Sequence, residues 1–277
     1  MTQRIAFQGE LGAYSHQACR ETYPDMDPMA CRTFEDAIEA VRSGQAELAM
    51  LPVENSTFGR VADIHHLLPQ SGLHIIAEAF VRVRISLLAM PGTPLDQIES
   101  AMSHPMLLGQ CRAYLSKHGI SRVTGADTAG SAKQVAEAAN PAMGALASAL
   151  AGEIYGLDVI ARDIEDEGNN TTRFLVMSRT PDTRPRGHHG MMSTFVFQVR
   201  NIPAALYKAM GGFATNGVNM TKLESYMVGG SFNATQFYAD IEGHPDDPAV
   251  RRALEELEYF TSEITMLGVY PADPGRH

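Results

Sequence analysis

Short apolar segments alternate with amphipathic helical segments along the first part of the chain, and this alternation restricts the fold more than any other feature. Residues 4–9 (RIAFQG) form an apolar run that ends in Gly, which is typical of a buried strand. The helix predicted at 33–44 begins with Thr33 as its N-cap and stops at Gly44. Residues 46–55 form another strand that ends in polar side chains. Strands that alternate with helices predict an α/β layer structure with a largely parallel sheet.

The middle of the chain continues this alternation. Helices are predicted over residues 94–102, 104–119 and 131–140, with a strand at 122–127 between the last two. Strands at 158–164 and 173–179 complete the first domain, which we place at 1–178.

The composition changes at residues 179–192, where Pro, Gly, Arg and His residues follow one another without an apolar period. This run predicts a linker to a second domain at 193–277. That domain is predicted as strand, helix, strand, strand, helix and strand, and its two central strands join through a turn at Gly229-Gly230. Six elements in this order within about 80 residues are typical of a ferredoxin-like split βαβ fold.

Charge and cysteine content exclude several classes of protein. The net charge of −10 argues against a nucleic-acid-binding surface, which needs a basic stripe. Cys19, Cys31 and Cys111 are an odd number without CxxC spacing, which argues against a disulfide framework and a zinc site. The N-terminal residues lack the apolar run of a signal peptide, and the apolar runs are too short to span a membrane. We therefore expect a soluble cytoplasmic protein that binds neither nucleic acid nor membrane.

Polar side chains gather where predicted strands end and predicted helices begin. They are Glu54, Asn55 and Ser56 after one strand, Ser103 and Gln110 along a helix start, Asp127 or Thr128 as a helix cap, and Asn169, Asn170, Thr171, Thr172 and Arg173 before the last strand of the first domain. Each cluster alone is typical of a polar turn or a helix cap. Together they predict a polar site with exposed helix N-termini and one guanidinium, which suits a small dianionic substrate. The sequence shows no nucleotide-binding loop, metal-ligand set or Ser-His-Asp arrangement.

Five motifs, in their order along the chain, resemble the prephenate dehydratase family. They are PVENSTFG (52–59), SHPMLLGQC (103–111), DTAGSA (127–132), ALASALAGEIYGL (145–157) and NNTTRF (169–174). The βαββαβ domain that follows, with GFATNGVNMTKLES at 212–225, resembles the ACT regulatory domain that this family carries at its C-terminus. The resemblance covers nearly the whole chain, and the order of the motifs makes it specific.

The resemblance implies a carbon–oxygen lyase that converts prephenate to phenylpyruvate, carbon dioxide and water in phenylalanine biosynthesis. The family uses no metal and no organic cofactor. Its catalytic domain has two α/β lobes with a cleft between them, similar to bilobal periplasmic binding proteins. By resemblance, the first lobe comprises about 1–75 plus 160–178, and the second comprises 76–159.

The resemblance also assigns roles to individual residues. Thr172 is the proton donor proposed in the family, and because a Thr hydroxyl is a weak acid, it donates a hydrogen bond to the leaving oxygen or relays a proton from water. Arg173 follows on an extended segment, so its side chain should point the opposite way. Two alternatives remain open for it, which are substrate binding and an ion pair with Glu or Asp at the lobe junction.

The remaining roles carry over from the same motifs. Glu54 and Asn55 are assigned as catalytic, and the substrate-binding residues are Ser56, Ser103, Gln110, Asp127, Thr128, Asn170 and, under the first alternative, Arg173. Met106 stands where the family usually has Gln after SHP.

In the second domain, the resemblance implies feedback regulation by L-phenylalanine, bound between paired ACT domains of a homodimer or homotetramer. The family's GAL and ESRP motifs are matched here by Ala204-Ala205-Leu206 and Glu224-Ser225-Tyr226-Met227. Ala in place of Gly removes the freedom to adopt positive φ, and Tyr in place of Arg removes a charge. The predicted contacts to phenylalanine are Asn201, Leu206, Asn216, Asn219 and Glu224.

Two alternatives to this function remain. Arogenate dehydratase acts on the amino analogue of the same substrate, and the sequence does not separate the two activities. A non-enzymatic amino-acid sensor, built from a bilobal binding module and an ACT domain, would be expected to lack the catalytic groups. Thr172 and Glu54 are both present.

Overall fold

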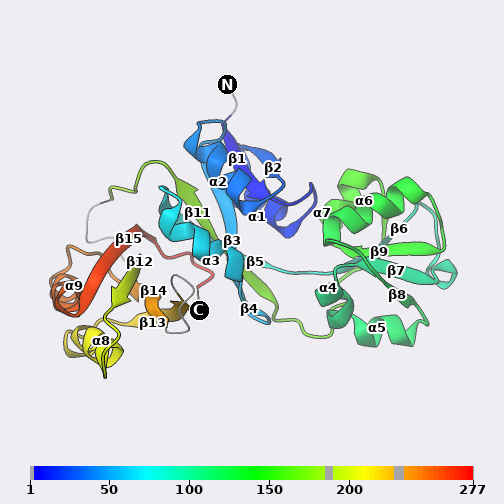
Figure 1. Cartoon of the computed structure of the whole chain (residues 1–277). Coiled ribbons are helices and arrows are strands. Elements are labelled where there is room, and N and C mark those ends of the chain that lie inside the picture. Colours follow the sequence, from blue (N-terminus) through cyan, green and yellow to red (C-terminus); the bar gives the residue numbers. More distant parts are fainter. Residues whose placement is uncertain (1–2, 185–189, 228–233, 277) are drawn as a thin grey trace. The chain divides into compact units, whose positions relative to one another are not determined.

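The computed structural model of the chain describes residues 3–184, 190–227 and 234–276 (Figure 1). The chain divides into two compact units, Met1–Ala62 with Ala79–Phe174, and Asp63–Glu78 with Leu175–His277. The predicted turn at Gly229-Gly230 and residues 185–189 of the predicted linker lie outside the described residues.

The first lobe of the first unit is built on parallel strands. Its elements are β1 (Arg4–Gln8), α1 (Tyr14–Thr22), β2 (Asp27–Cys31), α2 (Phe34–Arg42), β3 (Leu48–Asn55) and β4 (Gly59–Arg60). β1 lies between β2 and β3 and pairs with both in parallel. Thr33 caps α2 as predicted, because its hydroxyl accepts a hydrogen bond from the backbone N–H of Asp36 at 3.1 Å. The carboxyl ends of β1, β2 and β3 therefore meet at one edge of the sheet.

Strand β2 was not among the predicted elements. Its second residue is Pro28, which has no N–H group to donate to a neighbouring strand. The sheet tolerates this proline because β2 is an edge strand with β1 as its neighbour. The strand ends at Cys31, so that Arg32 follows at the same sheet edge as the polar end of β3.

The second lobe of the first unit is a separate five-stranded sheet with helices on it. Its elements are β6 (Ser86–Ala89), η2 (Leu95–Gln97), β7 (Ser100–Ser103), α4 (Pro105–Gln110), α5 (Arg112–Lys117), β8 (Ser121–Thr124), α6 (Thr128–Ala138), β9 (Met143–Ala147), α7 (Ala149–Tyr155) and β10 (Asp158–Ala161). The strand order is β10-β6-β9-β7-β8, with β7 parallel to β8 and β9, and β6 antiparallel to β9 and β10. Helices α4 and α6 begin just after the parallel strands β7 and β8 end, so their N-termini share one edge of this sheet.

The predicted helix at 94–102 is wrong. A single 3-10 turn at Leu95–Gln97 is followed by strand β7, which buries Ala101 and Ser103 and leaves the residues before them partly exposed. This alternation of buried and partly exposed residues is typical of a strand. In the sequence, however, a run of four residues is too short to distinguish the two-residue period of a strand from the 3.6-residue period of a helix.

The chain passes between the two lobes of the first unit twice, and the two crossings lie side by side. The backbone N–H of Val83 donates to the carbonyl of Asn170 at 2.9 Å, and that of Ile164 donates to the carbonyl of Ile85 at 3.1 Å. The second lobe is therefore an insertion whose two ends are adjacent.

Gly12 allows a close contact between the two lobes. Its φ is +90°, and a Cβ atom at this position would lie 2.7 Å from the Cα atom of Ala151 in α7. The hydroxyl of Ser148, which caps α7, donates to the Gly12 carbonyl at 2.6 Å. A residue with a side chain would be both strained and obstructed here, so glycine fixes this approach.

The second unit contains the predicted strand–helix–strand–strand–helix–strand order. Its elements are β12 (Met191–Val199), α8 (Ala205–Thr215), β13 (Met220–Met227), β14 (Ala234–Glu242), α9 (Pro248–Phe260) and β15 (Thr261–Pro271). The strand order is β13-β14-β12-β15, with antiparallel pairs throughout. Figure 1 shows α8 and α9 next to each other, and Phe195, Phe213, Ala253 and Leu257 belong to the core that these helices form with the sheet.

Strands β5 (His74–Arg82) and β11 (Thr171–Ser178) each contribute residues to both units. In the second unit, β5 pairs in parallel with β15 at Gly268 and Ile75, and helix α3 (Ala62–Leu67) continues into the 3-10 turn η1 (Leu68–Gln70).

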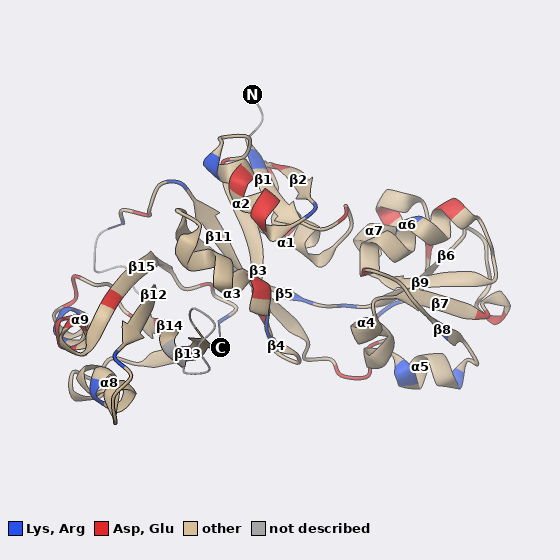
Figure 2. Cartoon of the chain, in the orientation of Figure 1, with Lys and Arg blue, Asp and Glu red and all other residues tan. Residues whose placement is uncertain are grey.

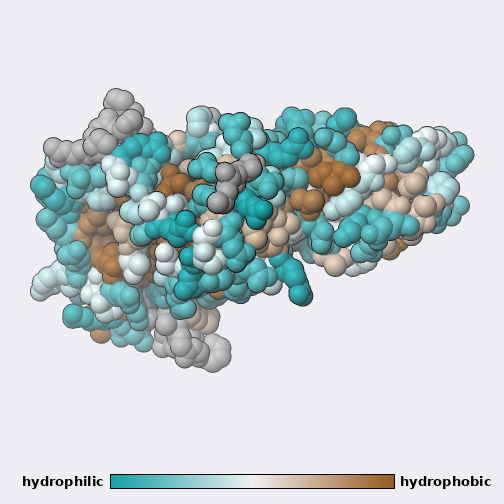
Figure 3. Space-filling model, turned by 90° about the horizontal axis from the view of Figure 1, so that it is seen from above, coloured by the Kyte–Doolittle hydropathy of each residue, from teal (hydrophilic) through white to brown (hydrophobic). Residues whose placement is uncertain are grey.

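The surface seen in Figure 3 is mostly hydrophilic, with separate hydrophobic patches. Over the residues that the structure covers, no helix combines the length and the apolar composition needed to cross a membrane.

Candidate functional site

A cavity of about 750 Å³ lies in the first unit, at the edge where its parallel strands end. Gln8 ends β1, Cys31 ends β2 and Asn55 ends β3, and all three line the cavity. Its volume falls in the range of small-molecule sites, which is about 300–1,000 Å³. Ligands of α/β proteins bind beyond the carboxyl ends of parallel strands, so this cavity is the candidate site.

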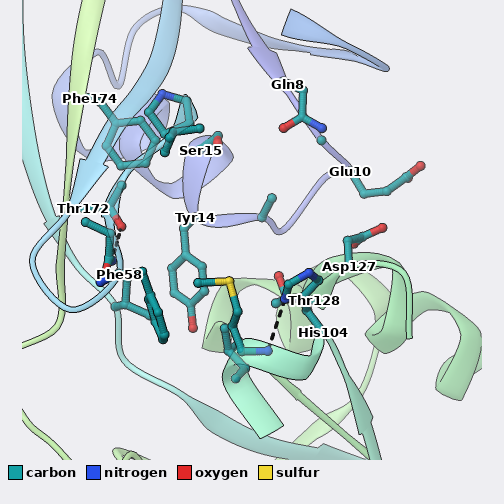
Figure 4. A pocket seen from close by; sticks show the side chains of 18 of the residues that line it. Gln8, Glu10, Tyr14, Ser15, Phe58, His104, Asp127, Thr128, Thr172 and Phe174 are labelled. Carbon is teal, nitrogen blue, oxygen red and sulfur yellow. Dashed lines mark hydrogen bonds between the residues drawn. The ribbon is translucent and has the colours of Figure 1, made fainter. Parts of the chain in front are cut away.

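The second lobe supplies the opposite wall through the start of two helices (Figure 4). His104 caps α4, and its Nδ1 atom accepts a hydrogen bond from the backbone N–H of Met106 at 3.3 Å. Asp127 caps α6, and its carboxylate accepts from the N–H of Gly130 at 2.6 Å. Figure 4 shows Thr172 and Phe58 on one side of the cavity and His104, Thr128 and Asp127 on the other.

Thr172, labelled in Figure 4, is held by the side chain of Asn55. The amide nitrogen of Asn55 donates to Thr172 Oγ1 at 3.0 Å and to Asn170 Oδ1 at 2.6 Å. The Asn55 Oδ1 atom in turn accepts from the backbone N–H groups of Thr57 and Phe58, at 2.9 and 3.0 Å. This turn fixes the amide orientation, so Thr172 accepts from Asn55 and keeps its own O–H to donate into the cavity.

Arg173 and Glu54 form an ion pair behind this wall. Arg173 Nη1 lies 2.9 Å from Glu54 Oε1, and the Arg173 side chain is 2% exposed. Neither residue lines the cavity. Side chains alternate in direction along β11, so Arg173 points away from the cavity that its neighbour Thr172 faces. Of the two alternatives for Arg173, the structure shows the ion pair.

Two predicted substrate-binding serines lie outside the cavity and bind backbone groups. Ser56 Oγ donates to the carbonyl of Asn169 and accepts from the N–H of Thr171, both at 2.9 Å. Ser103 Oγ is fully buried and donates to the carbonyl of Leu146 at 2.7 Å. These serines join the segments that carry the cavity wall.

The other predicted residues do line the cavity. They are Asn55, Gln110, Asp127, Thr128, Asn170 and Thr172. Gln110 Oε1 is buried, and it has no hydrogen-bond partner in the part of the chain that the structure describes. A buried acceptor without a partner is costly, so this oxygen is suited to bind a donor group of a ligand.

Several cavity residues were missed from the sequence, among them Tyr14, Arg32, Arg60 and His104. Arg32 was missed because strand β2, which it follows, was not predicted. Arg60 lies opposite Glu54 in the β3–β4 hairpin, and the signal for that hairpin in the sequence was Gly59, which adopts a φ of +78° here. The Tyr14 hydroxyl donates to the carbonyl of Arg84 at 2.9 Å, and burial raises its pKa well above the usual value.

The charged residues are distributed unevenly over the first unit. Figure 2 shows Asp and Glu on the outer faces of α1, α2 and α6, and Lys and Arg on α5. The cavity lining contains Glu10 and Asp127 beside Arg32 and Arg60. Within the described residues, no group of three or more His, Cys, Asp and Glu side chains is arranged to hold a metal ion.

His16 makes the stability of the first lobe depend on pH. Its ring stacks on Phe7 with centroids 5.3 Å apart, and its Nδ1 atom accepts from the N–H of Gly12 at 3.0 Å. Burial, with a smaller effect of Arg20, lowers the pKa of His16 below its usual value of 6.5. The unfolded chain therefore takes up a proton first as the pH falls, so stability is complete above about pH 6.5 and declines below it.

We expect His16→Gln, which keeps an acceptor for Gly12, to lose less thermal stability than the wild type when the pH falls from 7.5 to 5.5. Melting temperatures of both proteins, measured at several pH values, test this difference. Equal declines would assign the acid sensitivity to other groups.

The predicted phenylalanine contacts lie in the second unit. Asn216 donates to Glu256 Oε1 and accepts from Arg252 Nε, each at 2.9 Å, so it joins α8 to α9. Glu224 Oε1 pairs with Lys222 Nζ at 3.3 Å.

The structure also describes Ala204 and Tyr226, the positions at which this chain differs from the family's GAL and ESRP motifs. Ala204 adopts a φ of +61° although it has a side chain. The hydroxyl of Tyr226 lies 2.6 Å from His65 Nδ1 and is buried.

Comparison with known proteins places the chain in a family. The prephenate dehydratase family model matches residues 5–182. A bifunctional N-acyl-homoserine lactone acylase/prephenate dehydratase of Komagataeibacter europaeus is 51% identical over 272 residues, which cover 98% of this chain and 97% of that protein. Arogenate dehydratase/prephenate dehydratase 1 of Arabidopsis thaliana is 37% identical, over 98% of this chain and 72% of its own length.

A solved structure agrees with these sequence matches. The prephenate dehydratase of Arthrobacter aurescens, in complex with L-Phe, superposes with a TM-score of 0.88 at 31% identity, over 97% of this chain and 89% of that one. The chain belongs to the prephenate dehydratase family.

Proposed function

We propose that the chain converts prephenate to phenylpyruvate, carbon dioxide and water. The observation that carries this proposal is the hydroxyl of Thr172, which Asn55 holds so that its O–H is free to donate into the cavity. Family membership supports the reaction class.

The reaction breaks two bonds of the substrate. Prephenate is a cyclohexadiene that carries a carboxylate and a pyruvyl side chain on one ring carbon, and a hydroxyl on the carbon opposite. The bond to the ring carboxylate breaks and releases carbon dioxide, and its electron pair moves into the ring. The carbon–oxygen bond to the hydroxyl breaks at the other end, and the hydroxyl leaves as water after it takes up one proton.

The ring becomes aromatic in this reaction, which favours the products. The side chains of the cavity therefore need to supply only a small part of the driving force. Thr172 donates a hydrogen bond to the departing oxygen or relays a proton from water to it. Asn55 holds Thr172 in this orientation, and Asn170 accepts a hydrogen bond from the same Asn55 amide, which avoids reorganisation during the reaction. The apolar side chains of Val83, Leu107 and Phe174 in the lining exclude water from part of the cavity, which leaves a bound substrate less solvated.

Arogenate is a second candidate substrate. It carries an ammonium group where prephenate has a keto group, and the carboxylates of Glu10 and Asp127 in the cavity lining suit a cation. The relative in Arabidopsis thaliana is named for both substrates.

Cleavage of N-acyl-homoserine lactones is a second candidate activity. The relative in Komagataeibacter europaeus is named for it and for prephenate dehydration. Phe58 and Met106 line the cavity with 44% and 39% of their surface exposed, so they offer an apolar wall to an acyl chain.

Residues 193–277, within the second unit, are proposed to be an ACT regulatory domain that binds L-phenylalanine and pairs with its copy in a homodimer or homotetramer. The βαββαβ order and the L-Phe complex of the relative in Arthrobacter aurescens support this assignment. Asn201, Leu206, Asn216, Asn219 and Glu224 are the proposed contacts. Because Ala204 and Tyr226 replace the family's Gly and Arg, phenylalanine should bind differently here from the family pattern.

We expect the purified chain to form phenylpyruvate from prephenate in the presence of EDTA. The assay measures phenylpyruvate by its absorbance in alkali, with arogenate and an N-acyl-homoserine lactone as parallel substrates. Turnover of arogenate alone would move the assignment to the amino analogue, and hydrolysis of the amide bond of the N-acyl-homoserine lactone alone would make the chain an acylase. A properly folded protein that turns over none of them would support the amino-acid sensor.

A further inference from the structure

The cavity must balance the charge of its ligand with few cations. In the portion of the chain described here, the Lys and Arg side chains that line it are those of Arg32 and Arg60. Arg60 lies opposite Glu54 in the β3–β4 hairpin. Arg32 follows β2, is exposed, and makes no ion pair with the described residues. Because it also lines the cavity, its guanidinium is available to an anionic group of a ligand.

The position of Arg32 relative to Thr172 follows from the sheet. β1 pairs with β2 on one side and with β3 on the other. Adjacent strands lie about 4.8 Å apart, so Arg32 starts about 10 Å from the end of β3. Thr172 is hydrogen-bonded to Asn55 at that end. A ligand that reaches from Thr172 to the long side chain of Arg32 therefore crosses the end of β1.

The chemistry of the ligand determines which of its groups fits each end. The hydroxyl of prephenate and the ring carbon that bears both carboxyl-containing groups are on opposite sides of the ring. A cation on the carboxylate that becomes carbon dioxide would stabilise the ground state more than the transition state and slow the reaction. A cation on the pyruvyl carboxylate carries no such penalty, because that group keeps its charge throughout.

We propose that Arg32 binds the side-chain carboxylate that prephenate passes on to phenylpyruvate, on the side of the ring opposite the hydroxyl that faces Thr172. This inference rests on the proposed dehydratase function. It holds equally for arogenate, which has a carboxylate at the same place. Arg32 is then a substrate-binding residue that contacts the carboxylate common to substrate and product.

The experiment compares Arg32→Gln with Arg42→Gln, which removes a surface arginine paired with Glu39 on α2. For each variant, kcat and KM for prephenate and the inhibition constant of phenylpyruvate are measured. We expect Arg32→Gln to raise KM and the phenylpyruvate inhibition constant together, by about ten- to hundred-fold, because a charged hydrogen bond is lost. We expect kcat to change little, Arg32→Lys to recover part of the affinity, and Arg42→Gln to behave as the wild type.

Two outcomes would overturn the inference. If KM rises while phenylpyruvate inhibits as before, Arg32 binds the carboxylate that leaves. If neither constant changes while the wild type turns over prephenate, Arg32 does not contact the ligand. If the wild type itself shows no turnover, the proposed function fails, and calorimetric titration of phenylpyruvate into the wild type and Arg32→Gln still decides whether Arg32 binds this carboxylate.

Discussion

Replacing Thr172 by valine is expected to lower kcat/KM for prephenate by about 10²–10⁴-fold, the range by which positioned proton donors accelerate reactions. Valine has nearly the same shape, so the loss reports the hydroxyl and not a change in packing. Thr172 Oγ1 also accepts from Asn55, and the valine leaves one N–H of that amide unpaired. Steady-state rates of phenylpyruvate formation give the effect.

Two further substitutions make this prediction specific. Thr172→Ser keeps the hydroxyl and should retain most of the activity. Thr171→Val changes the neighbouring threonine of β11, which does not line the cavity, and should leave kcat close to the wild-type value. A valine at position 172 that reacts as fast as the wild type would assign proton donation to another group, with His104 as the next cavity residue to test.

Replacing Arg276 by methionine is expected to destabilise the second unit by about 3–5 kcal/mol, which is the usual effect of breaking a buried ion pair from one side. Arg276 donates to the Glu78 carboxylate through Nε at 2.7 Å and Nη2 at 2.6 Å. The Glu78 side chain is 0% exposed, so its charge would lose a two-point partner without gaining water. Arg276 also donates to Thr221 Oγ1 at 3.2 Å, which joins the C-terminal residues to β13.

Urea unfolding, followed by circular dichroism, measures this loss of stability. Arg251→Met is the matched control, because Arg251 and Glu255 form an ion pair with both side chains more than half exposed, and such pairs contribute about 0–1 kcal/mol. Adding Glu78→Gln to Arg276→Met should recover part of the loss, since the unpaired charge of Glu78 is then gone, while Asp240, which is also buried and lies 3.9 Å from Arg276 Nη2, still lacks this neighbour. An Arg276→Met protein as stable as the control would show that Glu78 is neutralised by other means.

The sequence predicted most of the elements, and its errors have local causes. The βαββαβ order was predicted because its strands and helices are long and strongly periodic. Strand β2 was missed because Pro28 is unusual in strands, and only its place at the sheet edge explains why it is tolerated. The helix predicted at 94–102 was wrong because the four residues of β7 are too few to distinguish the period of a strand from that of a helix.

The cavity residues were predicted less completely than the fold. The facing directions of Thr172 and Arg173 followed from the two-residue period of a strand. The sequence could not show that Ser56 and Ser103 bond backbone groups, because their partners Asn169 and Leu146 are distant in sequence. Arg32 follows a strand and Tyr14 begins a helix, and their side chains line the cavity only once the lobe has folded.

The hydrogen bond between Asn55 and Thr172 joins residues that are 117 positions apart, with the whole second lobe between them. At translation rates of about 5–20 residues per second, Asn55 leaves the ribosome on the order of ten seconds before Thr172 does. During that interval the edge of β3 that later receives β11 has no partner, because Ser56 bonds Thr171 only after the chain returns. An unpaired strand edge promotes aggregation, so the nascent chain should depend most on chaperones in this window. The separation of Asn55 and Thr172 along the chain thus also sets how long the growing protein is most prone to aggregate.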